Sequence, residues 1–188
     1  DPNTSFVVIS EAPERIERDY RAYPVRAVRQ RSYYYPLEFV SGVASGAIGT
    51  LASAIKGSDL FLLGGGGILR DNTSVRNLVR VVDECVLANL LGVPVALFAL
   101  GVGPIGTKWG ARIIRWVADR SAVITVRDPN SAEILRAIGV RRAPIHVTAD
   151  PAFLLEPDPA AMDAGAIGLP SGASPARPLV GIFPCEGI

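Results

Sequence analysis

The stretch that decides the fold is LFLLGGGG at residues 60–67, in which four apolar residues are followed at once by four glycines. A continuous apolar run of this length is typical of a strand that is buried on both faces, as in a parallel sheet. Similar runs occur at residues 6–9, 95–100, 122–126 and 145–148. Because they alternate with helix-like segments, the sequence predicts an α/β fold, a Rossmann-like and mainly parallel sheet of these five strands with helices on both faces.

Helix-like segments separate these strands, and several of them carry signals for a helix end. Pro13 lies in the first turn of the first segment, a position that proline tolerates well. Gly92 and Gly139 each follow a predicted helix, as glycine often does. The sequence predicts helices at residues 11–20, 37–55, 75–91, 109–120 and 129–138, a short strand at 25–28 and a loop at 33–36.

The composition of the chain changes after residue 155. Residues 156–178 are rich in Pro, Gly, Ala and Ser, which is the composition of a linker. An apolar run at residues 179–183 then predicts one more buried strand. Since one strand cannot form a domain, we expect a Rossmann-like N-terminal domain at residues 1–155, a linker at 156–178 and the first strand of a truncated second domain at 179–188.

The overall composition argues against several classes of protein. The chain has 188 residues, of which 49% are hydrophobic and 20% charged, so it can bury a sizeable core. A net charge of +1 predicts no binding to nucleic acid or to an anionic membrane. One histidine and two cysteines are too few for a histidine-based metal site or a disulfide scaffold. No apolar run reaches the ~18 residues of a membrane span, so we expect a soluble, cytoplasmic protein without a transmembrane segment.

The glycines that follow the strands are candidates for ligand binding. In an open parallel sheet, ligands bind at the edge formed by the carboxyl ends of the strands. Glycines there let the backbone approach an anion closely, and a following helix N-terminus adds N–H donors. The run at 64–67 matches neither the GxGxxG nor the GxxxxGK[ST] phosphate pattern, so a tight strand-to-helix turn explains it equally well. The candidate binding glycines are Gly64, Gly65, Gly66, Gly67, Gly101 and Gly103.

Three charged residues follow the same strand ends. Arg127 comes directly after a predicted strand and could hold a carboxylate or a phosphate through two parallel hydrogen bonds. The alternative for this arginine is an ion pair with Asp128 or with a loop acid. Asp71 and Asp150 could each act as a general acid or base, although helix capping and loop tethering are commoner roles for such carboxylates. We therefore take Arg127, Asp71 and Asp150 as the candidate catalytic residues.

Two residues of reactive types lie inside predicted elements instead. His146 belongs to the strand predicted at residues 145–148, where we expect it to be packed or half-exposed rather than catalytic. Cys85 lies in the helix predicted at residues 75–91 and is expected to be a small core residue.

Five segments between residues 58 and 155 carry a resemblance to a known family. They are SDLFLLGGGGILRD at 58–71, GVPV at 92–95, GVGPI at 101–105, TVRD at 125–128 with the Ser, Leu and Gly-Val that follow it, and TADPAF at 148–153. Each segment is weak alone, but their order and spacing make the match specific. Together they resemble the polysaccharide pyruvyl transferase family.

This resemblance implies a two-domain fold similar to that of GT-B glycosyltransferases, with most of the N-terminal half in this chain. Members of the family usually begin with a strand and a glycine-rich GN.GDE loop, and no such segment precedes Phe6 here. Their second domain carries further substrate-binding residues, including a histidine. We therefore expect the first strand, its loop and the C-terminal domain to be missing, and residues 1–188 alone to be inactive.

The resemblance also implies a reaction. It is the transfer of a pyruvyl group from phosphoenolpyruvate to two hydroxyls of a sugar in a cell-surface polysaccharide or its precursor, which forms a ketal. Arg127 would then contact the donor. Phosphoenolpyruvate is a donor substrate, so neither a cofactor nor a metal is expected. Two alternatives stay open, namely a GT-B-like glycosyltransferase that uses a nucleotide sugar and a non-catalytic binding module on the same scaffold.

Overall fold

The computed structural model describes residues 3–30, 46–72 and 74–156. The chain divides into two compact units, Asp1–Pro151 and Ala152–Ile188. All strands and α-helices given below belong to the first unit. The loop predicted at 33–36, the strand predicted at 179–183 and all but the first residue of the predicted linker lie outside the described residues. The division of the chain at residue 155 therefore stays a prediction.

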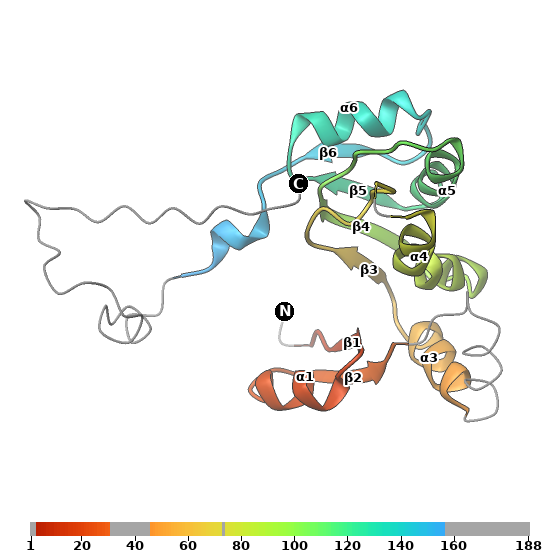
Figure 1. Ribbon diagram of the computed structural model, residues 1–188. Helices are drawn as coiled ribbons and strands as arrows, with labels where there is room; N and C mark the ends of the chain where they lie inside the picture. Colours follow the sequence, from red (N-terminus) through yellow and green to blue (C-terminus); the bar gives the residue numbers. More distant parts are fainter. Residues whose placement is uncertain (1–2, 31–45, 73, 157–188) are drawn as a thin grey trace, which may run out of the picture. The chain divides into compact units, whose positions relative to one another are not determined.

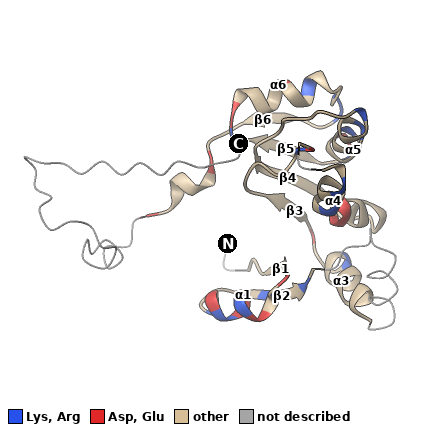
Figure 2. Cartoon of the chain, in the orientation of Figure 1, with Lys and Arg blue, Asp and Glu red and all other residues tan. Residues whose placement is uncertain are grey.

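The N-terminal strand pairs with its neighbour in sequence. β1 (Phe6–Ser10) and β2 (Val25–Arg29) form a two-stranded parallel sheet. The helix between them is α1 (Pro13–Asp19), along which acidic and basic side chains alternate (Figure 2). The prediction that residues 6–9 lie in the main sheet is wrong, because the short crossover through α1 brings β2 alongside β1.

The other strands form a four-stranded parallel sheet in the order β3-β4-β5-β6 (Figure 1). They are β3 (Phe61–Gly64), β4 (Val95–Leu100), β5 (Val123–Val126) and β6 (Ile145–Val147). Every neighbouring pair is parallel, and the observed bounds lie close to the predicted ones. The predicted α/β, Rossmann-like fold with parallel strands is therefore confirmed.

The helices alternate with these strands along the chain. They are α3 (Ala47–Lys56), which precedes β3, and α4 (Val75–Leu90), α5 (Lys108–Ala118) and α6 (Pro129–Ala137), which join successive strands. The helix predicted at residues 37–55 is confirmed only from residue 47 onwards, since residues 31–45 lie outside the described part. At the N-termini of the three connecting helices, backbone N–H groups donate to the side chains of Ser74, Thr107 and Asp128.

The core lies between the four-stranded sheet and its helices. Leu62 on β3 and Phe98 on β4 are not part of it, because their exposed fractions are 52% and 42%. The register of β3 and β4 puts both side chains on the same face of the sheet. Because the strand order β3-β4-β5-β6 moves in one direction, right-handed crossovers place α4, α5 and α6 on the face opposite Leu62 and Phe98. The expected helices on both faces are therefore not found for these three connecting helices. The large, fully buried side chains include Leu51, Leu69, Leu78, Leu97, Leu100, Ile114, Ile124 and Leu135.

β4 is irregular near its carboxyl end. The register of β4 against β5 shifts between Leu97 and Leu100. Within this interval, Ala99 has a φ of 50°, in the left-handed region that few residues other than glycine adopt. Its N–H donates a hydrogen bond of 2.7 Å to the Thr125 hydroxyl on β5. The irregularity directly precedes Gly101, so it shapes the sheet edge at which the candidate site lies.

Candidate functional site

The glycine loop after β3 lies against the end of β4. Gly65 and Gly66 have φ angles of 81° and 78°, which side chains other than glycine would strain. The N–H of Gly65 donates to the Phe98 carbonyl at 3.1 Å, and the N–H of Gly101 donates to the Gly66 carbonyl at 2.9 Å. Within the described residues, the N–H groups of Gly66 and Gly67 donate to no protein acceptor. The loop is thus fixed to the sheet while two of its donors stay available to a ligand.

The glycine loop does not itself begin a helix. α4 starts at Val75, and the Ser74 side chain already accepts hydrogen bonds from its first N–H groups. The expected contribution of a directly following helix N-terminus to anion binding therefore does not arise at Gly67. The backbone of the loop, rather than a helix dipole, is what this strand end offers.

Arg127 lies against two of the candidate glycines. It directly follows β5, and a Cβ built at Gly101 would lie 3.1 Å from both its Nε and its Nη2. A Cβ at Gly67 would lie 3.8 Å from the same Nη2. The guanidinium can occupy this place because residue 101 has no side chain. The ends of β3, β4 and β5 come together around it.

Arg127 also forms an ion pair with the end of β6. Its Nη1 lies 3.0 Å from Oδ2 of Asp150, and the two side chains are 39% and 31% exposed. The alternative of an ion pair with a loop acid is therefore what the structure shows. Pairing with Asp128 is not found, because that carboxylate accepts from the N–H and the hydroxyl of Ser131, each at 2.7 Å. A half-exposed ion pair contributes about 0–1 kcal/mol to stability. The contact therefore orients the guanidinium more than it stabilises the fold.

The other edge of this guanidinium lies beside the glycine backbone. Among the described residues, Nε and Nη2 of Arg127 have no carboxylate or carbonyl partner. They lie beside Gly67 and Gly101, on the side of the fork away from the Asp150 contact. Two parallel N–H groups on one edge of an arginine are the geometry that binds a carboxylate or phosphate in a bidentate way.

Asp71 occupies a different place. It is 6% exposed and accepts hydrogen bonds from the Gly106 N–H at 2.6 Å, from the Thr107 N–H at 2.9 Å and from the Thr107 hydroxyl. Burial raises its pKa, but these three hydrogen bonds lower it more, so the net pKa lies below its usual value. A Cβ at Gly110 would lie 2.2 Å from Asp71 Oδ2, so the first turn of α5 closes over the carboxylate.

These contacts join the loop after β3 to the start of α5. Among the described residues, Asp71 has no hydrogen bond or ion pair with Arg127 or Asp150. The contacts of Thr107 and Gly110 were not predicted from the sequence, although a threonine directly before a helix is a signal for an N-cap. A catalytic role for Asp71 stays a prediction.

Gly103 is a packing position. It has a φ of 95° and precedes a cis peptide bond to Pro104. A Cβ at this position would lie 2.8 Å from Cδ1 of Ile134 on α6, and its N–H donates to the Leu69 carbonyl at 2.8 Å. The φ of 95° favours glycine here whatever the space beside it, and the contact with Ile134 adds to this. The predicted contact with a substrate stays a prediction.

The two residues of reactive types, His146 and Cys85, lie inside secondary-structure elements. His146 is exposed on β6, and Cys85 is buried in α4. Burial, with the nearby Glu84 and Asp83 carboxyls, raises the pKa of the Cys85 thiol to about 12. Burial and Asp83 together raise the pKa of Glu84 to about 9. The glutamate at position 84, among apolar residues at helical spacing, is the signal for this buried acid in the sequence.

Comparison with protein families decides which family this fold represents. The model of the family described as polysaccharide pyruvyl transferase matches residues 1–180. The chain belongs to the polysaccharide pyruvyl transferase family. The match includes β1 and β2, which lie outside the motif segments of residues 58–155. No curated protein and no solved structure matched the chain. Among the described residues of this family member, no helix is long and apolar enough to cross a membrane.

Proposed function

We propose that the protein transfers the pyruvyl group of phosphoenolpyruvate to two hydroxyls of one sugar, in a cell-surface polysaccharide or in its precursor. Membership of the family supports pyruvyl transfer as the type of reaction. The donor, the acceptor and the ketal product are the parts of the proposal that go beyond it.

The arrangement of Arg127 over two glycines supports this choice of donor. Phosphoenolpyruvate carries a carboxylate and a phosphate close together. The Nε and Nη2 groups of Arg127 have no acceptor among the described residues and can donate to one of these groups, while the N–H groups of Gly66 and Gly67 lie at the adjacent strand end. Asp150 fixes the opposite edge of the guanidinium at 3.0 Å, so the fork is oriented before the donor binds.

The chemistry of such a transfer needs an acid, a base and anion-binding groups. A proton adds to the methylene carbon of phosphoenolpyruvate, and positive charge develops on the neighbouring carbon, which a sugar hydroxyl attacks with loss of its proton. The C–O bond to phosphate then breaks and inorganic phosphate leaves. A second hydroxyl of the same sugar attacks the resulting oxocarbenium carbon and gives its proton to a base, which closes the ketal ring. An arginine on the phosphate or the carboxylate stabilises the charge that changes during these steps.

The two candidate carboxylates suit different parts of this scheme. Asp150 is partly exposed beside Arg127, so it can reach a bound donor or acceptor and exchange a proton. Asp71 is buried and already accepts three hydrogen bonds. In this proposal Asp71 positions the loop after β4, and Asp150 is the better candidate for proton transfer.

Ligand choice tests the proposal. Phosphoenolpyruvate and a nucleotide sugar such as UDP-glucose are titrated separately into the protein in a calorimeter. We expect saturable binding of phosphoenolpyruvate and, with a polysaccharide acceptor, release of inorganic phosphate. Binding of the nucleotide sugar without binding of phosphoenolpyruvate would support the glycosyltransferase alternative and overturn the proposal.

A further inference from the structure

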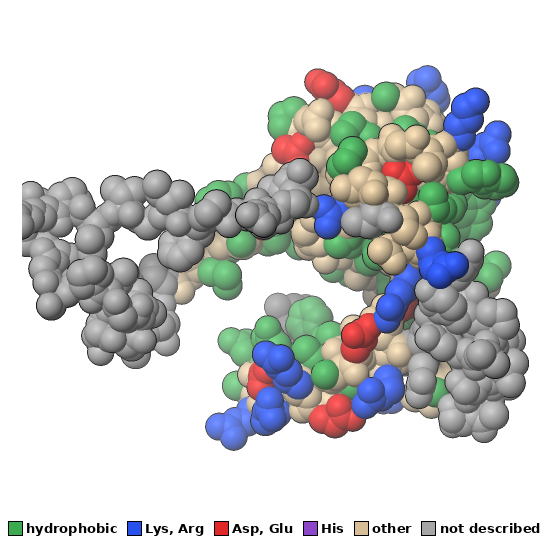
Figure 3. All heavy atoms as spheres, in the orientation of Figure 1, with side chains coloured by type: hydrophobic (Ala, Val, Ile, Leu, Met, Phe, Trp, Pro, Cys, Tyr) green, Lys and Arg blue, Asp and Glu red, His purple; other side chains and the backbone are tan. Residues whose placement is uncertain are grey.

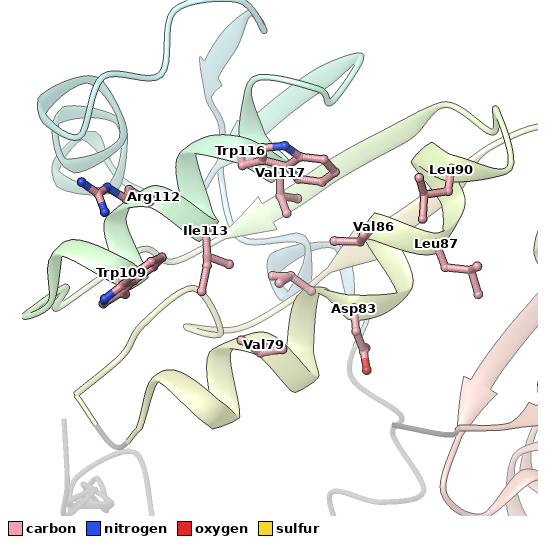
Figure 4. A pocket seen from close by; sticks show the side chains of 11 residues that line it. Val79, Asp83, Val86, Leu87, Leu90, Trp109, Arg112, Ile113, Trp116 and Val117 are labelled. Atoms are coloured by element: carbon pink, nitrogen blue, oxygen red, sulfur yellow. The ribbon is translucent and has the colours of Figure 1, made fainter. Parts of the chain in front are cut away.

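An apolar groove runs between α4 and α5, away from the site of Arg127. Its volume is about 670 Å³. Figure 4 shows the side chains that line it. Side chains from both helices point into it, and they are mainly apolar. The lining residues include Val79, Val86 and Leu90 on α4 and Trp109, Ile113 and Trp116 on α5.

α5 exposes large apolar side chains although it already packs on the core with another face. α5 buries Ile114, Val117 and Ala118 against the rest of the protein. Trp109 and Trp116 are nevertheless 67% and 37% exposed, so α5 carries apolar side chains beyond those that the core uses. Large exposed apolar side chains that gather in one place mark a site of interaction. Figure 3 shows exposed hydrophobic side chains next to Lys and Arg side chains on the side where α5 lies.

The spacing of the lining residues fits a third helix. On α5, Trp109, Ile113 and Trp116 follow the i, i+4, i+7 pattern of a helical stripe. On α4, Val79, Val86 and Leu90 repeat at i, i+7, i+11, which also keeps them on one side of their helix. Two such stripes bordering one groove accept the apolar stripe of another helix. From Val79 to Leu90 the groove runs for roughly 16 Å, or about three helical turns.

The charges at the groove select the partner. The guanidinium of Arg112 lies 5.3 Å from the ring centre of Trp109, and that of Arg120 lies 4.1 Å from the ring centre of Trp116. Arg112 lies on α5 and Arg120 follows the end of that helix at Ala118, whereas Asp83 of α4 is the acidic residue among those lining the groove. The two arginines beside the tryptophans attract acidic side chains. A second copy of this chain would bring the same two arginines against each other, and a flat anionic membrane does not fill a concave groove.

We propose that this groove binds an amphipathic helix of about three turns, with an apolar stripe and acidic flanks, carried by a partner polypeptide. The inference does not depend on the proposed pyruvyl transfer, since the groove shares no residue with the candidate site. The partner helix places its apolar stripe between Leu90 and the two tryptophans. Its acidic residues reach Arg112 and Arg120 at the rim.

Two matched synthetic peptides test the inference. Each is a helix of about 15 residues with leucines at i, i+3, i+4 and i+7, flanked by glutamates in one and by lysines in the other. Tryptophan fluorescence of the protein and anisotropy of the labelled peptide report binding. We expect saturable binding of the glutamate peptide, at least about tenfold tighter than binding of the lysine peptide, and a reversed preference in Arg112→Glu.

Variants at exposed positions provide the controls. Leu90 is 76% exposed, so Leu90→Glu should fold normally and weaken binding of the glutamate peptide about tenfold or more. Phe153, 85% exposed and outside the groove, serves as the matched control as Phe153→Glu. Circular dichroism confirms that each variant is folded. The inference is overturned if neither peptide binds, if both bind equally, if Leu90→Glu binds like the control, or if the groove instead mediates self-association or binding to anionic vesicles.

Discussion

The position of the Arg127 guanidinium depends on a residue that has no side chain. A Cβ at Gly101 would lie 3.1 Å from Nε and Nη2 of Arg127 and 3.2 Å from the Gly67 backbone. Gly101→Ala should therefore displace the fork and weaken phosphoenolpyruvate binding by about tenfold, as measured by calorimetry. Gly49→Ala is the matched control, because a Cβ there meets nothing within 4 Å. Equal affinities in the two variants would show that the position of the fork does not matter.

Thr125 stabilises the irregular end of β4. Its hydroxyl accepts the N–H of the buried Ala99 at 2.7 Å. Thr125→Val keeps the shape of the side chain and leaves that N–H without its partner, which should lower the free energy of unfolding by about 1–3 kcal/mol in urea titrations. Thr125→Ser retains the hydroxyl and should recover most of the loss. Equal stability of the valine and serine variants would rule out this hydrogen bond as the cause.

At the scale of a single element, α4 carries a buried acid that favours its neutral form. Burial and the neighbouring Asp83 raise the pKa of Glu84 to about 9 from 4.5, and Gln30 Nε2 lies 3.1 Å from its Oε1. The folded state then binds more protons than the unfolded state between about pH 4.5 and pH 9, so this group lowers stability as pH rises through that window.

Glutamine is a permanent mimic of the neutral acid at this position of α4. Glu84→Gln should therefore raise the melting temperature at pH 8, and its advantage over the unmodified protein should shrink towards pH 5. Melting curves of both proteins across this range test the prediction. Glu133→Gln, on the exposed surface of α6, is the control and should give no such trend. An advantage that stays constant with pH would contradict the account.

At the scale of the whole molecule, continuous apolar runs such as residues 95–100 predicted the parallel sheet well. Such runs suit strands inside a layered α/β fold. The pairing of β1 with β2 was not predictable in the same way, because burial alone does not say which of several apolar strands is the neighbour. The exposure of Leu62 and Phe98 depends on which face the crossovers cover, and this is a property of the topology rather than of the run.

The candidate site also has features that the sequence predicts and features that it does not. The order of the strands, which all end at one edge, explains why residues from four different strand ends were predicted to meet there. Arg127, Gly67, Gly101 and Asp150 do come together. Asp71 was predicted from the same rule, yet its environment depends on the Thr107 cap and on Gly110, contacts that only the folded loop creates.

The affinity of Arg127 variants for phosphoenolpyruvate tests the central claim most directly. Arg127→Ala removes the fork and should weaken binding about 10- to 30-fold, while Arg127→Lys keeps the charge without the fork and should fall between this variant and the unmodified protein. Melting temperatures should change little, because the ion pair with Asp150 is half-exposed. Arg136→Ala, an exposed arginine of α6, controls for general loss of positive charge. A folded Arg127→Ala protein that binds phosphoenolpyruvate with unchanged affinity would contradict the account.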